Sequence, residues 1–106
     1  ILEMLQMVSL NSIQKHHVDG PKTLIVLSDL LQNSKQLNMY RSSPTFEEFA
    51  STTYAQKTKI NFQGVDIQVH YLQNSPSLQV DKLFRFWREY FKASGAKSLN
   101  LVALPG

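Results

Sequence analysis

The sequence has no cysteine among its 106 residues, and this absence excludes several classes of protein. A disulfide scaffold, a thiolate zinc site, an iron–sulfur cluster and a cysteine nucleophile all require that residue. Glycine is scarce as well: the 4 glycines do not cluster, so no glycine-rich loop is present to hold a phosphate. The Gly-x-Ser-x-Gly sequence of serine hydrolases is also missing.

Long hydrophobic runs are missing too, since none approaches the roughly 18 residues of a membrane-spanning helix. The apolar fraction of 42% is nevertheless sufficient for a hydrophobic core, so we do not expect a disordered chain. The net charge of +3 is mildly basic and by itself says little about partners. The length corresponds to one small domain or to part of one.

The chain begins inside a pattern that is typical of an amphipathic helix. Its apolar stripe consists of Ile1, Met4, Leu5 and Val8. The pattern predicts a helix from residue 1 to about residue 17, which Gly20 and Pro21 end. Because a native chain rarely begins inside a helix, we expect these residues to be a piece of a longer domain.

Three further segments have the composition of strands. Thr23–Ser28 is an apolar run without alternation, which is typical of a strand buried on both faces of a parallel sheet. Val65–Tyr71 alternates between apolar and polar residues, which predicts a strand with one buried face, nearer a sheet edge. Ser98–Leu104 predicts a last strand.

Two segments between these strands are predicted to be helices. Thr45 can cap a helix over residues 46–57, and two glutamates follow in its first turn. Residues 78–94 repeat apolar side chains at spacings of three and four, and Gly95 ends the repeat. Phe86 lies beside the main apolar stripe, so we expect it to be partly exposed.

Helices and strands therefore alternate along the chain. This alternation predicts an α/β fold of Rossmann-like type: a mostly parallel sheet with right-handed crossovers and helices on both faces. Ligands of such sheets bind at the carboxyl ends of the strands. Asp29 directly follows the first predicted strand, where a carboxylate can ligate a hard cation, act as a base or cap the next helix.

The segment Gly20–Asp29 resembles the part of von Willebrand factor A-type domains that carries an aspartate of their metal site. In that family an apolar strand ends in Thr-Asp or Ser-Asp, and Ser28-Asp29 matches this pair. The resemblance implies that the chain is the carboxyl-terminal half of such a domain. It also implies that Asp29 is one ligand of a divalent cation, usually Mg²⁺, whose other ligands come from residues outside this chain. The family's Asp-x-Ser-x-Ser motif is absent here, and Leu30 stands where the family usually has glycine.

The same resemblance implies a non-enzymatic module that binds a protein partner through the rim of its sheet. That rim is predicted to hold Ser28, Gln32, Asn33 and Ser34 beside the aspartate. The partner is either another protein or the missing amino-terminal half of the domain. The alternation alone equally fits half of a flavodoxin-like or receiver-like domain, so a fragment of another doubly wound enzyme or cofactor-binding domain stays open.

A further alternative is contact with nucleic acid through the basic face of the helix predicted over residues 78–94. That face consists of Lys82, Arg85, Arg88 and Lys92. Asp81 and Glu89 interrupt it, so the sequence favours a solvated face over a nucleic-acid site. His16 and His17 point in different directions on a helix, which disfavours a metal site there.

Overall fold

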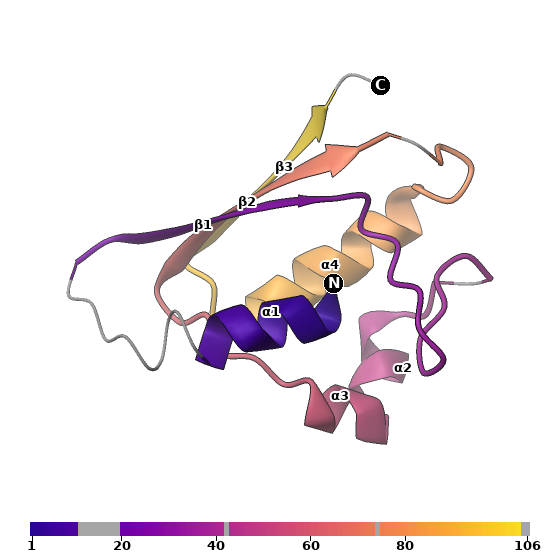
Figure 1. The fold of residues 1–106 in the computed structure, drawn as a ribbon, viewed down its shortest axis with the longest axis horizontal. Coiled ribbons are helices and arrows are strands. Elements are labelled where there is room, and N and C mark those ends of the chain that lie inside the picture. Colours follow the sequence, from indigo (N-terminus) through magenta and orange to yellow (C-terminus); the bar gives the residue numbers. More distant parts are fainter. Residues whose placement is uncertain (11–19, 42, 74, 105–106) are drawn as a thin grey trace.

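The computed structural model describes residues 1–10, 20–41, 43–73 and 75–104 (Figure 1). Helices and strands alternate in it, as the sequence predicts. The elements are α1 Leu2–Val8, β1 Lys22–Ser28, α2 Phe46–Ala50, α3 Thr53–Lys57, β2 Val65–Leu72, α4 Asp81–Ala93 and β3 Ser98–Leu104. Within these ranges, none of the helices combines the length and the hydrophobicity needed to cross a membrane.

The three strands form one sheet in the order β1-β2-β3, and both pairs are parallel. The register aligns side chains in rows across the sheet. Val26 of β1 pairs with Val69 of β2, which pairs with Leu101 of β3. The predicted parallel α/β fold is confirmed at this level.

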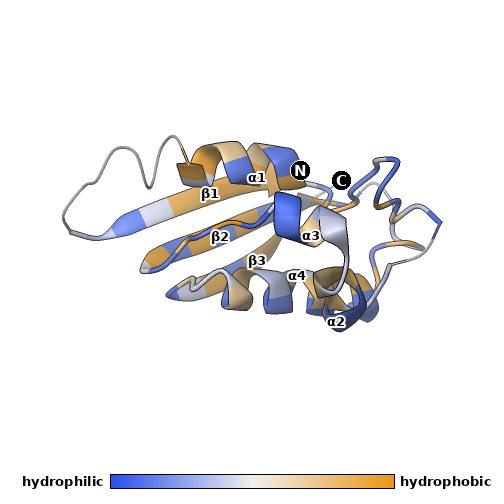
Figure 2. Ribbon diagram, turned by 90° about the horizontal axis from the view of Figure 1, so that it is seen from below, coloured by the Kyte–Doolittle hydropathy of each residue, from blue (hydrophilic) through white to orange (hydrophobic). Residues whose placement is uncertain are grey.

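All the described helices lie on one face of the sheet (Figures 1 and 2). The prediction of helices on both faces is therefore wrong for the residues that the structure describes. The strand order supplies the reason, because strands that follow chain order are joined by crossovers on one side when the crossovers share one hand. Covering both faces requires a strand order that reverses within the sheet.

Strand β1 shows the consequence for its apolar run. Val26 faces the helices and is 3% exposed, whereas Ile25 and Leu27 point to the other face and are 65% and 66% exposed. The prediction that this strand is buried on both faces is thus wrong in the described structure. Successive strand residues point to opposite faces whatever their chemistry, so an unbroken apolar run covers both faces of the strand.

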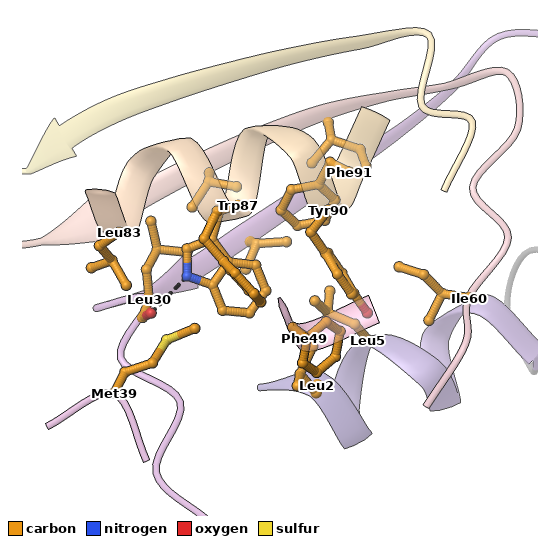
Figure 3. Packing of buried hydrophobic residues seen from close by; sticks show 14 of the residues in the cluster. Leu2, Leu5, Leu30, Met39, Phe49, Ile60, Leu83, Trp87, Tyr90 and Phe91 are labelled. Atoms are coloured by element: carbon orange, nitrogen blue, oxygen red, sulfur yellow. Dashed lines mark hydrogen bonds between the residues drawn. The ribbon is translucent and has the colours of Figure 1, made fainter. Parts of the chain in front are cut away.

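The core lies between the sheet and α4, whose Trp87 is fully buried. The indole nitrogen Nε1 of Trp87 donates a hydrogen bond of 2.8 Å to the carbonyl oxygen of Leu30 (Figure 3). Phe86 is also buried, which corrects the expectation of partial exposure. The cause is α2, whose Phe49 ring lies edge-on to Phe86 with 5.3 Å between centroids.

The single helix predicted over residues 46–57 is two short helices. Thr45 and Glu48 form the predicted cap of α2, each side chain bonding to the other's backbone nitrogen. Helix α2 ends at Ala50, and the Thr52 hydroxyl then accepts a hydrogen bond from the Ala55 nitrogen to begin α3. The first predicted helix is described as α1 over Leu2–Val8, Ser9 keeps helical backbone angles, and residues 11–19, including the histidine pair, lie outside the described residues.

Candidate functional site

The Asp29 carboxylate lies at the carboxyl end of β1, as predicted, and it is engaged by its own loop. Its Oδ1 accepts a hydrogen bond of 3.0 Å from the Leu31 nitrogen, and its Oδ2 lies 3.5 Å from the Tyr40 hydroxyl, which donates to it. Leu30 adopts a φ of 63°, in the left-handed region. That conformation costs a non-glycine residue about 1–2 kcal/mol, and burial of the Leu30 side chain with the Trp87 hydrogen bond holds it in place.

The other predicted rim residues divide into two groups. Ser28 Oγ accepts from the Leu30 nitrogen, and Ser34 Oγ accepts from the Leu37 nitrogen, so both hydroxyls order the loop. Asn33 is exposed and forms an isolated backbone bridge with residue 38. Gln32 differs from these residues because it is buried, at 3% exposure.

The amide of Gln32 is used inside the molecule. Its Oε1 accepts from the backbone nitrogens of Ile1 and Leu2 at 2.9 and 3.0 Å, which caps the start of α1. Its Nε2 lies 3.4 Å from the Tyr54 hydroxyl and 3.5 Å from Glu3 Oε2. Gln32 therefore joins β1's following loop to two helices and is not presented to a partner.

Tyr54 and Glu3 complete this polar cluster, which sequence patterns did not indicate. The Tyr54 hydroxyl donates a hydrogen bond to Glu3 Oε1. This bond lowers the pKa of Glu3 below its ordinary value. Burial, and then the hydrogen bond to Glu3, raise the pKa of Tyr54 to about 12. The cluster ties α1 to α3, whose residues are about fifty positions apart in sequence.

The cation site that the von Willebrand resemblance implies stays a prediction, because its other ligands are expected from residues outside this chain. Over residues 1–10, 20–41, 43–73 and 75–104, no three His, Cys, Asp or Glu side chains group closely enough to hold a metal ion. Divalent cations such as Mg²⁺ need several oxygen ligands, and one Asp29 oxygen already accepts the loop's backbone hydrogen bond. We therefore derive no chemistry through a metal from this chain.

The basic face of α4 is present, and acidic residues lie among its cations. Its residues Lys82, Arg85, Arg88 and Lys92 are all exposed. Lys82 and Arg85 line one surface hollow together with Glu47 and Glu89. Hydrogen bonds from the Thr45 backbone and side chain, and then the nearby Lys82 charge, hold the pKa of Glu48 below its ordinary value. Positive and negative side chains are therefore mixed on this face, which disfavours binding to the negatively charged phosphate backbone of a nucleic acid.

The most unusual surface is the face of the sheet that the described helices leave uncovered, which we call the bare face. Its large apolar side chains are Ile25, Leu27, Leu72 and Val102, all exposed. Its polar side chains on the central strand are Asp66, Gln68 and His70, all half-buried. Sequence reasoning missed this surface, although the alternation of β2 already signalled that one of its faces is polar.

Comparisons of the chain with protein families, with characterised proteins and with solved structures found no match.

Proposed function

We propose that this chain is a non-enzymatic protein-interaction module that pairs with a second copy of itself through the bare face of its sheet. One observation carries the proposal: Ile25 and Leu27 stand largely exposed on a sheet whose strands are all parallel. Parallel sheets occur almost only with both faces covered. Contiguous apolar side chains on a surface mark sites of association.

The polar pattern of the central strand favours a second copy as the partner. Along β2 the bare face carries Asp66, then Gln68, then His70. A two-fold interface places the same patch on both sides, so the patch must complement itself. When two β2 strands stack antiparallel with the axis at Gln68, each Asp66 faces the His70 of the other copy. The two Gln68 amides face each other, so each polar side chain on this face of β2 meets a complementary one.

The register extends this match to the neighbouring strand. Ile25 of β1 pairs with Gln68 of β2, so the same two-fold axis brings Ile25 against Ile25 of the other copy. Leu27 then lies against Thr23 of the other copy, whose methyl group covers part of it. This arrangement buries Ile25 and part of Leu27 without leaving a carboxylate unpaired.

The size of the face sets the strength of the pairing. Three strands about 4.8 Å apart, each about 23 Å long, give a face of roughly 350 Å². Stable interfaces bury about 800 Å² on each partner. We therefore expect a weak, concentration-dependent dimer with a Kd of about 100 µM.

Sedimentation equilibrium between about 10 µM and 1 mM tests the pairing. We expect the average mass to rise toward that of a dimer, and the double variant Ile25→Lys with Leu27→Lys to remain monomeric. Met7→Lys is the matched control, because Met7 is 63% exposed on α1, away from the bare face. A wild-type chain that stays monomeric throughout, or equal weakening by the control, would overturn the proposal.

The geometry of the pairing has its own test. Asp66→Lys should weaken the dimer, because a lysine ammonium then replaces the carboxylate that faces His70 of the other copy, and the ammonium cannot accept a hydrogen bond as the carboxylate did. Combining it with His70→Asp should restore dimerisation, since each introduced ammonium at position 66 then faces an introduced carboxylate at position 70 of the other copy, with donor and acceptor in exchanged positions. A double variant as weak as Asp66→Lys alone would rule out this antiparallel arrangement.

The resemblance of Gly20–Asp29 to von Willebrand factor A-type domains further supports the proposal of a protein-interaction module, because that family consists of binding modules. The cation-dependent binding of the family is not part of this proposal, because the described residues group no three metal-binding side chains and the remaining ligands are expected from outside this chain. The basic face of α4 is likewise not proposed as a nucleic-acid site, because Glu47 and Glu89 lie among its cations.

A further inference from the structure

A small pocket lies among the helices, on the opposite side of the molecule from the bare face. It lies between α2, α3 and the end of α4 and measures about 130 Å³. Its lining is mainly apolar and includes Phe46, Phe49, Ala50, Ala55, Ile60 and Tyr90. Three polar side chains also border it: Gln56 and Lys59 are exposed, and Ser94 is buried with its hydroxyl donating to the Phe91 carbonyl oxygen.

The hydroxyl group of Tyr90 indicates that this pocket can bind a ligand. The residue is 6% exposed, and its hydroxyl has no hydrogen-bond partner in the part of the chain that the structure describes. Figure 3 shows the Tyr90 side chain pointing from α4 toward Phe49, Leu5 and Ile60, and of these Phe49 and Ile60 line the pocket. Buried polar groups are almost always paired, so a lone buried hydroxyl beside a cavity indicates a missing acceptor.

The state of this hydroxyl defines what it can bind. Burial raises the pKa of Tyr90 above its ordinary value, so the phenol stays protonated at physiological pH. A protonated phenol donates one hydrogen bond. An anion would have to leave water to reach it, which is costly in an apolar pocket. A neutral oxygen atom can accept this hydrogen bond and can leave water at a lower cost than an anion.

The size and lining of the pocket define the rest of the ligand. A dry apolar cavity of about 150 Å³ is large enough to hold benzene in another protein. The rings of Phe46 and Phe49 also favour an aromatic neighbour, because aromatic rings attract one another in tilted and edge-to-face arrangements. We propose that this pocket binds a small neutral molecule with one aromatic ring and one oxygen, which accepts a hydrogen bond from the Tyr90 hydroxyl.

Phenol and toluene are suitable probes because they have the same number of heavy atoms and differ only in the oxygen. Their binding is followed by NMR titration of the Ile60 methyl signals. For the wild type we expect phenol to bind with a Kd of about 1 mM. In Tyr90→Phe the phenol Kd should rise about fivefold, as expected for one lost hydrogen bond, while the toluene Kd changes less than about twofold.

Tyr40→Phe is the matched control, since Tyr40 is exposed and lies outside the pocket lining. It should leave both Kd values unchanged. Ala55→Leu, which fills the pocket from α3, should abolish binding of both probes and supports the site even if Tyr90→Phe does not fold. The proposal would be overturned if neither probe shifted the Ile60 signals up to about 20 mM. It would also be overturned if Tyr90→Phe weakened the binding of both probes equally. A phenol Kd that is unchanged in Tyr90→Phe would overturn it as well, because the Tyr90 hydroxyl would then donate to water and not to the ligand.

Discussion

The two faces of the sheet are built from neighbouring residues and differ completely in what they do. On β1, Val26 is buried under the helices, while Ile25 and Leu27 on either side of it are exposed on the bare face. All three are large aliphatic residues in one strand. Which of them stabilises the fold is decided by the side on which the helices pack. The bare face is therefore available for association without loss of the core.

The polar groups follow the same division. On the helical side, Gln32, Tyr54 and Trp87 each donate or accept hydrogen bonds within the molecule. On the bare face, Gln68 and His70 are half-buried side chains of a strand whose other face buries Val65, Ile67 and Val69 completely. We expect mutations on the helical side to change stability and mutations on the bare face to change association.

Truncating Trp87 should give the largest loss of stability. Trp87→Ala removes the largest buried side chain and also the donor to the Leu30 carbonyl. Large-to-small changes of this kind cost about 3–5 kcal/mol. Urea unfolding followed by circular dichroism measures the loss. Arg88→Ala, one residue further and exposed, should stay within about 0.5 kcal/mol, and a similar loss in both variants would contradict the role given to the helical side.

The sharpest test of the two faces uses adjacent residues of β1. Val26→Ala should lower the free energy of unfolding by about 2 kcal/mol, because it empties space in the core. Leu27→Ala removes more atoms but should cost less than about 0.5 kcal/mol, since its side chain is already in water. The measurement is urea unfolding at about 5 µM, where the proposed dimer is dissociated. Equal losses would mean that the bare face is covered in solution.

Much of the fold could be predicted from local patterns. The three strands and α4 lie within a few residues of their predicted bounds, and Thr45 forms the cap that its sequence indicates. These features depend on hydrophobic period and on capping, which neighbouring residues determine. The break between α2 and α3 was not predicted, because a threonine such as Thr52 can cap a new helix as readily as it can continue an existing one.

The bare face could not be predicted in the same way. An unbroken apolar run such as Thr23–Ser28 has the same sequence pattern whether one or both faces of the strand are covered. Only the order of the strands in the sheet distinguishes these two cases. Gln32 was also misplaced in the rim, because its polar composition does not reveal that it caps α1 from thirty residues away. Both features depend on contacts between distant segments, which local composition does not encode.

The smallest expected effect concerns the pH dependence of stability, which should reside on the helical side. The pKa of Tyr54 is raised to about 12 in the fold, against about 10 in an unfolded chain. Above pH 10 the unfolded state therefore loses this proton first, and stability falls as the pH rises toward the folded value. Because Tyr54 is partly exposed, its share of the loss between pH 8 and 11 should stay below about 1 kcal/mol. Tyr54→Phe should flatten the alkaline slope of unfolding free energy by that amount, and Gln36→Ala, at an exposed residue that does not titrate, should leave the slope as in the wild type. A slope that is identical in all three proteins would show that the Tyr54–Glu3 contact does not persist in solution.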